Sequence, residues 1–171
     1  MAWLEKLLRS KAVVVTLIVL PGLWPAWPLL RHDPTVLADP LKYVLHHLGF
    51  VACLLLAIVL TFTPLRVLFP KWGIALALNR HRRLVGVSAF FYAALHFATH
   101  LLYEGGFRVL ASDVTKPFLI SGLLAFAILL VLAVTSLHAA LRWLGGKRWK
   151  NLHRLVYLAA VLVGRSAAVT S

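Results

Sequence analysis

The stretch FFYAALHFATH, residues 90–100, places His96 and His100 four residues apart among apolar and aromatic side chains. On a helix this spacing puts both imidazoles on one face. Polar groups in such surroundings are costly and often mark function, and neutral imidazole is a common metal ligand. A b-type haem held between helices takes neutral imidazoles from different helices on the two sides of its iron. With both axial positions filled, such an iron passes electrons and does not activate oxygen.

The eight histidines sort into two levels when positions along the expected helices are measured at about 1.5 Å per residue. On this scale His96 lies about 20 Å outward of Arg83. The outer level consists of four histidines: His46, His47, His96 and His100. The inner level consists of His138 and His153, with His81 at its edge.

Each histidine also has a simpler interpretation, as an interfacial side chain whose tip lies in headgroups or water. That interpretation accounts for four of them, which lie in loops or near a helix start: His32, His46, His47 and His81. For His100 and His138 both interpretations stay open. His96 and His153 are the best haem-ligand candidates by depth and context. The aromatic and small residues beside His96 would suit a flat porphyrin, but they are equally ordinary membrane core.

Long apolar blocks must position these side chains. Of the 171 residues, 61% are hydrophobic and only 13% are charged, whereas soluble domains are about a quarter charged. A bilayer-spanning helix needs about 20 mostly apolar residues. Five blocks qualify or come close: 11–30, 43–64, 84–103, 117–141 and 151–169. We therefore predict an all-α, polytopic transmembrane bundle of about five spans, folded as one domain over residues 1–171.

The distribution of charge predicts the topology of the bundle. The formal net charge is +13, and most cations precede the first block or lie in alternate connections. The opposite connections hold few cations and four acids: Asp33, Asp39, Glu104 and Asp113. This asymmetry follows the positive-inside rule and predicts a cytoplasmic N-terminus. The cations thus act as topology determinants, and we expect no nucleic-acid partner.

The remaining motifs exclude several kinds of site. Cys53, the only cysteine, is expected to be buried in the second span as a small hydrophobe. A single cysteine excludes an internal disulfide, covalent haem attachment through Cys-x-x-Cys-His, and a thiolate metal cage. No glycine-rich nucleotide loop occurs. The connection between the second and third blocks is long enough for a short interfacial helix near Trp72, and Gly145 and Gly146 are expected to end the fourth span. The first block, with its three prolines, does not resemble a signal peptide.

Several stretches together resemble a known family. They are ADPLKYVLHHLG, RRLVGVSAFFYAALHF, DVTKPFLISG, LAVTS and LGGKRWKNLHRLVYLAA. They are similar, over about residues 38–160, to the haem-binding membrane subunits of the bacterial periplasmic methionine sulfoxide reductase system (the MsrQ/YedZ family). That family belongs to the ferric-reductase-like transmembrane proteins. The combination of RRLVG…LHF with KRW…LHRLVY makes the resemblance specific.

The resemblance implies a b-type haem in a bundle of about six helices in the bacterial inner membrane. It implies a chain that does no substrate chemistry and relays electrons from a cytoplasmic flavin reductase or quinol. The acceptor would be a periplasmic molybdopterin enzyme that reduces methionine sulfoxide in oxidised proteins. The family ligands correspond to His96 in ALHF and His153 in NLHRLVY. FMN is a further candidate cofactor, and five cations would suit its phosphate, although topology already explains them: Arg82, Arg83, Lys147, Arg148 and Lys150.

The tail departs from the family pattern. A third family histidine is expected 13 residues beyond His153, where this chain has Ser166, and the segment 164–171 is atypical, without a sixth helix. We hypothesise that His96 lacks its usual partner, so that an outer haem is five-coordinate, absent or rescued by His100, His46 or His47. An inner haem on His153 would be less affected. Its opposite neighbour would be one of three residues: His138, His81 or Arg82.

Two other classes of function remain open. One is another ferric-reductase-like or cytochrome b561-like oxidoreductase that acts on iron or quinone, against which DVTKPF and KRWKNLHRLVY argue. The other is a haem-free scaffold that only docks a partner, or a non-functional member of the family. Ser166 and the missing sixth helix keep the scaffold interpretation open. Haem content distinguishes it from the oxidoreductases.

Overall fold

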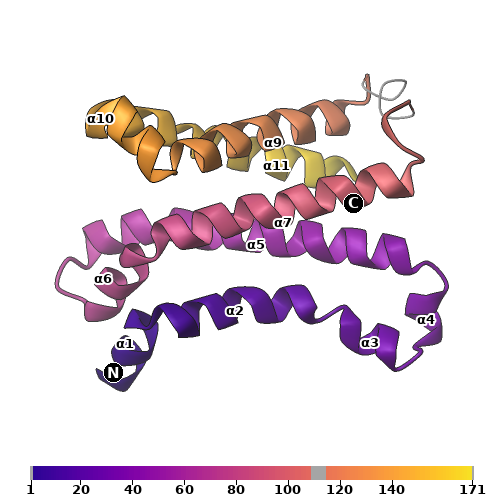
Figure 1. Ribbon diagram of the computed structural model, residues 1–171, viewed down its shortest axis with the longest axis horizontal. Coiled ribbons are helices and arrows are strands. Elements are labelled where there is room, and N and C mark those ends of the chain that lie inside the picture. Colours follow the sequence, from indigo (N-terminus) through magenta and orange to yellow (C-terminus); the bar gives the residue numbers. More distant parts are fainter. Residues whose placement is uncertain (1, 109–114, 171) are drawn as a thin grey trace. The chain divides into compact units, whose positions relative to one another are not determined.

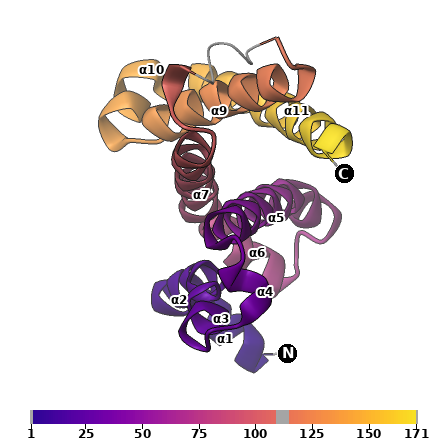
Figure 2. The same ribbon diagram turned by 90° about the vertical axis from the view of Figure 1, so that its right-hand side faces the viewer.

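The computed structural model describes residues 2–108 and 115–170, without the side chains of residues 2, 138, 139, 141 and 167–170. All regular secondary structure in these ranges is helical. The chain forms two compact units, Met1–Tyr92 and Ala93–Ser171 (Figures 1 and 2). Their boundary falls inside one helix, α7, Arg82–Tyr103. The fold class predicted from the sequence is therefore confirmed as helical, and each unit is described by itself.

The first unit contains six complete helices and the start of α7. They are α1, Ala2–Arg9; α2, Lys11–Leu23; α3, Ala26–Leu30; α4, Pro34–Leu37; α5, Pro40–Leu68; and α6, Gly73–Arg80. Two Asp-Pro pairs start the helices α4 and α5, because Asp33 and Asp39 are N-caps and the prolines occupy the first helical positions. The Asp33 carboxylate accepts hydrogen bonds from the Thr35 hydroxyl and amide, at 2.7 Å and 3.0 Å, and these bonds lower the pKa of Asp33.

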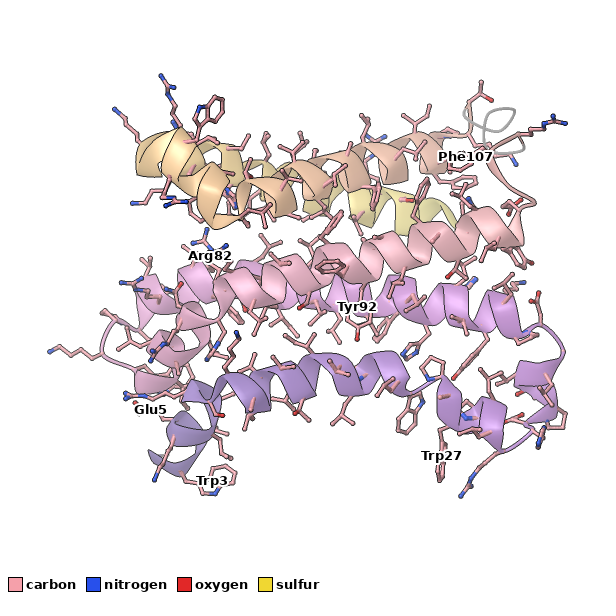
Figure 3. All side chains as sticks on the ribbon, in the orientation of Figure 1. Trp3, Glu5, Trp27, Arg82, Tyr92 and Phe107 are labelled. Atoms are coloured by element: carbon pink, nitrogen blue, oxygen red, sulfur yellow. The ribbon has the colours of Figure 1, made fainter. Side chains whose placement is uncertain are left out.

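The helix α2 is shorter than the predicted block 11–30 and is held by two side chains from neighbouring helices. Pro25 has no amide hydrogen, so the Pro21 carbonyl accepts instead from the Trp24 amide, three residues on, at 3.3 Å. The His47 Nε2 atom of α5 lies 2.6 Å from that carbonyl oxygen. The Tyr92 hydroxyl of α7 donates to the Ile18 carbonyl at 2.8 Å (Figure 3). A Cβ atom at Gly22 would overlap the Tyr92 hydroxyl, so this close approach requires glycine.

Besides the rest of α7, the described residues of the second unit form α9, Pro117–Thr135; α10, His138–His153; and α11, Leu155–Thr170. Helices α9 and α11 lie side by side and antiparallel in Figure 1. Their contact buries small and branched residues, among them Ala125, Leu129 and Ala159. The predicted fourth span, 117–141, ends earlier than expected, at Thr135. The expected break at Gly145 occurs, with φ at 73°, but it divides α10.

Three helices of the described ranges are long and apolar enough to span a bilayer: α5, α7 and α9. The first and fifth predicted blocks form α2, with 13 residues, and α11, with 16 residues, which are shorter than the roughly 20 residues that a span needs. The short helix predicted near Trp72 is present as α6. The prediction that Cys53 is buried is wrong, because its side chain is exposed on α5.

Candidate functional site

The best-defined candidate ligand is His153, at the C-terminal end of α10. Its Nδ1 atom lies 3.1 Å from the carbonyl oxygen of Trp149, one helical turn earlier. A carbonyl oxygen only accepts hydrogen bonds, so Nδ1 carries the proton of the neutral ring. The Nε2 atom therefore carries the lone pair. This is the arrangement that prepares a histidine for an iron atom, because the second nitrogen fixes the tautomer and the ring orientation.

The Nε2 atom of His153 points at the hydroxyl of Ser136, which is 3.3 Å away. Ser136 is only 8% exposed and follows the last residue of α9. Its hydroxyl also donates to the Leu132 carbonyl at 2.8 Å. A serine hydroxyl has one proton, and the Leu132 carbonyl is the closer acceptor for it. The contact with Nε2 is consequently weak, which leaves the lone pair suitable for ligation.

Trp149 holds His153 from a second side. Its indole lies against the imidazole with ring centroids 3.9 Å apart and an interplanar angle of 29°. The indole N–H donates to the Thr135 carbonyl at 3.1 Å. Trp149 thus ties the imidazole of α10 to the end of α9. The sequence reasoning missed both Trp149 and Ser136. Only the four-residue spacing within WKNLH indicated that Trp149 and His153 share a helix face.

The second predicted ligand, His96, is half-buried on α7 and also takes part in contacts. Its neighbour Phe97 stacks on Phe126 of α9, with ring centroids 5.1 Å apart. Measured along α9, Phe126 lies about 6 Å from Gly122 and about 15 Å from Ser136. His96 therefore lies well outward of His153 within this unit, and His100, also half-buried, lies one turn further out.

Ser166, which stands where the resemblance predicts a third histidine, makes a contact between helices. Its hydroxyl donates to the Phe118 carbonyl at 3.0 Å. The same oxygen lies 3.7 Å from the position of a Cβ atom at Gly122. The segment from residue 164 continues α11 as far as Thr170. Here a hydroxyl joins α11 to the start of α9 where a ligand was expected.

The other candidates are placed as follows. His138 begins α10, but its side chain lies outside the described part. Arg82 begins α7 in the first unit, is half-buried and has contacts of its own. Two further histidines are exposed: His32 and His46.

Two histidines predicted to have their tips in water or headgroups differ from that expectation. His47 contacts the backbone of α2, as described above. His81, between α6 and α7, is only 8% exposed, and its Nε2 atom has no hydrogen-bond partner among the described residues.

The donor set fits haem better than a free metal ion. Within the described ranges, no three His, Cys, Asp or Glu side chains gather into a metal-ion site. Haem brings four nitrogens of its own and asks the protein for one or two axial ligands. A neutral histidine whose Nε2 lone pair faces the Ser136 hydroxyl in a weak contact, and which a stacked indole and a backbone carbonyl orient, fits that requirement.

Comparisons with known proteins agree with the resemblance. The family "Ferric reductase like transmembrane component" matches residues 48–164. A Herminiimonas arsenicoxydans protein is 43% identical over 128 residues, which is 73% of this chain and 57% of the relative. A Polaromonas naphthalenivorans protein is 36% identical over 159 residues, covering 90% of this chain and 68% of the relative. Both bear the name "Protein-methionine-sulfoxide reductase heme-binding subunit MsrQ".

An Azospira oryzae protein of the same name is 39% identical over 161 residues, covering 92% of this chain and 66% of the relative. The chain thus spans between 57% and 68% of the length of these three relatives. No solved structure gives a significant match.

Proposed function

The chain belongs to the ferric-reductase-like transmembrane family and, within it, to the haem-binding subunits of protein-methionine-sulfoxide reductase systems, and we propose that it relays electrons through b-type haem. The observation that carries this proposal is the His153 cluster, defined here as His153, Trp149 and Ser136. The cluster orients one neutral imidazole for an axial position. Bound haem would supply a one-electron redox centre there. The protein would perform no substrate chemistry itself.

The residues of the cluster have separate tasks in this proposal. The Trp149 carbonyl holds the proton on Nδ1, so Nε2 stays free of a proton and can bind iron. The Trp149 indole prevents rotation of the imidazole about its Cβ bond. Ser136 keeps its own proton on the Leu132 carbonyl and so does not compete for the Nε2 lone pair. Together they reduce the reorganisation that electron transfer at this site would require.

At the outer level we propose that His96 is the family ligand and that it lacks its usual partner. Ser166 has no lone pair suited to haem iron, and its proton is used in the bond to Phe118. His100, one turn outward of His96, is the nearest replacement on the same helix face. Haem at this level would be five-coordinate, absent or rescued in this way, whereas an inner haem on His153 would be less affected.

The partners follow from the family. We propose that electrons enter from the cytoplasm through a flavin reductase or quinol and leave to a periplasmic, molybdopterin-containing methionine sulfoxide reductase. The chain would then serve protein repair from the bacterial inner membrane, with its N-terminus in the cytoplasm. A phosphate of FMN could be held by basic residues at the cytoplasmic side. Topology explains these residues without FMN: Arg82, Arg83, Lys147, Arg148 and Lys150.

One observation favours a second candidate, a haem-free docking scaffold. The bond between Ser166 and Phe118 closes α11 onto α9 at the expected position of a ligand. A reduced-minus-oxidised absorbance spectrum of the purified protein, with haem quantified as the pyridine complex, separates the two. We expect the sharp α-band of b-type haem. No haem, after expression with ample haem supply, would leave the scaffold as the function.

A transfer experiment tests the proposed acceptor. The chemically reduced protein is mixed with the purified molybdopterin enzyme, with and without a peptide that contains methionine sulfoxide. We expect rapid reoxidation only when both enzyme and peptide are present. Reoxidation by ferric iron or quinone alone, at the same rate, would favour another ferric-reductase-like or cytochrome b561-like oxidoreductase.

A further inference from the structure

The first helix, α1, has an apolar side and a cationic side. Trp3 and Leu7 lie one turn apart on its apolar side, and they are 69% and 41% exposed. Arg9 lies roughly opposite Leu7, and Lys6 lies about 100° around the helix from Leu7; both cations are exposed. A helix of 8 residues is marginal in water by itself. To be stable, α1 therefore needs contact with a surface that binds both its apolar and its cationic side.

One edge of α1 is already occupied within the first unit. The Glu5 carboxylate lies where a Cβ atom of Gly73 would be, against the first turn of α6. Glu5 also forms an ion pair with Arg9. Figure 3 shows Glu5 at α6 and Trp3 on the outer side of α1. Docking on α6 therefore fixes the rotation of α1 and leaves the apolar side and the cations uncovered.

The chain turns between α1 and α2 and does not continue as one long helix. Ser10 has extended backbone angles, φ −75° and ψ 121°, and α2 begins at Lys11. Apolar residues follow from Ala12, so the end of the predicted span 11–30 that carries Lys11 is the expected membrane boundary. A short amphipathic helix at such a boundary, set at an angle to the span, is typical of a helix that lies in the membrane surface.

Cations from α2, α5, α6 and the connection between α5 and α6 lie at the same end of the first unit as α1. Helices α1 and α5 both pack on α6, which brings their ends together (Figure 1). Six exposed cations share this end: Lys6, Arg9, Lys11, Arg66, Lys71 and Arg80. Glu5 is the one acid in these segments, 2–11 and 66–80, and its charge is paired with Arg9. Trp72, 39% exposed, is a second exposed tryptophan in these segments, in addition to Trp3.

We propose that α1 lies in the plane of the membrane surface and, with α6, forms a binding site for the headgroups of anionic phospholipids. Trp3 and Leu7 enter the boundary with the acyl chains, and the six cations bind headgroup phosphates. Such cations contribute about 1 kcal/mol each near an anionic surface. The apolar side of α1 favours lipid over a soluble acidic protein as the binding partner, because the membrane boundary expected at Lys11 lies beside it.

The first test compares two equal removals of charge. The variant Lys6→Gln/Arg9→Gln/Lys11→Gln and the variant Lys147→Gln/Arg148→Gln/Lys150→Gln each lose three exposed cations from a basic segment. Both are purified from membranes that contain phosphatidylglycerol, and retained lipid is counted by native mass spectrometry. We expect a severalfold loss of phosphatidylglycerol in the first variant and little change in the second. Equal loss in both would show unspecific attraction to basic loops and overturn the proposal, as would no loss in the first.

The second test does not depend on charge removal. Spin labels are placed at Leu7→Cys or Lys6→Cys in a Cys53→Ala background, and the full chain is reconstituted in vesicles with phosphatidylglycerol. We expect the label at position 7 to collide mainly with dissolved oxygen and the label at position 6 mainly with a water-soluble nickel complex. Access of nickel to both labels would place α1 in water. Protection of both from both reagents would indicate a protein partner. Either result overturns the proposal.

Discussion

The two ends of α9 in the second unit each make a contact that involves a serine hydroxyl, but with different partners. At the inner end, Ser136 meets His153 at 3.3 Å. At the outer end, Ser166 meets the backbone of Phe118 at 3.0 Å. In the first contact an imidazole faces a hydroxyl whose proton is used elsewhere. In the second, the hydroxyl itself closes the contact and no lone pair suited to iron remains.

The difference shows that the ability of a residue to bind haem iron depends on the groups around it as much as on its own type. His153 is oriented by three contacts from its own helix and from α9. Each of these would also hold α10 against α9 without a cofactor. What points to ligation is their combined result, a neutral ring whose lone-pair nitrogen is only weakly engaged by Ser136.

The largest expected effect is the loss of the inner haem in His153→Ala. Removal of the imidazole removes the axial ligand, and the absorbance of six-coordinate b-type haem should fall to background. The control is His32→Asn, because His32 is exposed and is not a ligand candidate at either level, and asparagine tolerates its positive φ. Haem per protein, measured as the pyridine complex, checks both. Unchanged haem in His153→Ala would disprove the inner assignment.

The next effect is a gain, in Ser166→His. The neighbouring residue on α9 is Gly122, which leaves room beside position 166 for a larger side chain. We expect the haem-to-protein ratio to rise by up to one haem per chain. The rise should vanish in a double variant with His96→Ala and should not occur in Ser166→Ala. If the ratio stays constant in Ser166→His, the outer level needs more than this one residue.

A smaller, graded effect is expected at Trp149. Trp149→Phe keeps a ring against the imidazole but loses the bond to the Thr135 carbonyl, whereas Trp149→Leu loses both. We expect haem occupancy to fall in the order wild type, Phe, Leu, with an equilibrium cost of about 1 kcal/mol for the lost hydrogen bond. Haem titration of the apo-protein measures it, and the reduction potential should shift in the same order. Equal occupancy in all three would make Trp149 a purely structural contact.

Long apolar blocks predicted the helical fold, which is confirmed, and a polar group at membrane depth made His153 a candidate ligand, which stays a prediction. The sequence did not predict where helices break inside an apolar run. The block 117–141 is apolar beyond Thr135, but the chain leaves the helix at Ser136 and Leu137. The block 11–30 divides because prolines remove amide donors, and the His47 contact that compensates comes from 26 residues away.

The environments predicted from polarity were also wrong for two histidines. His47 and His81 read as interfacial residues, yet one contacts a helix backbone and the other is buried. The partners that decide this belong to other helices, which a pattern along one chain segment does not encode. Trp149 was missed for the opposite reason. An aromatic residue in a basic turn is common, and only its position one turn before His153 distinguishes it.

The smallest effects are expected at the two serines. They distinguish the two ends of α9, because one substitution should change the stability and the other the reduction potential. Ser166→Ala removes a hydrogen bond between two helices, which in membrane proteins costs about 0.6 kcal/mol on average. Ser136→Ala removes a bond back to its own helix and should change unfolding less, but it removes the group that faces Nε2 of His153. We therefore expect Ser166→Ala to lower stability without moving the haem spectrum, and Ser136→Ala to shift the reduction potential at nearly constant stability. Unfolding in detergent and a potentiometric titration of both variants check this. The reverse pattern would place the functional contact at the outer end.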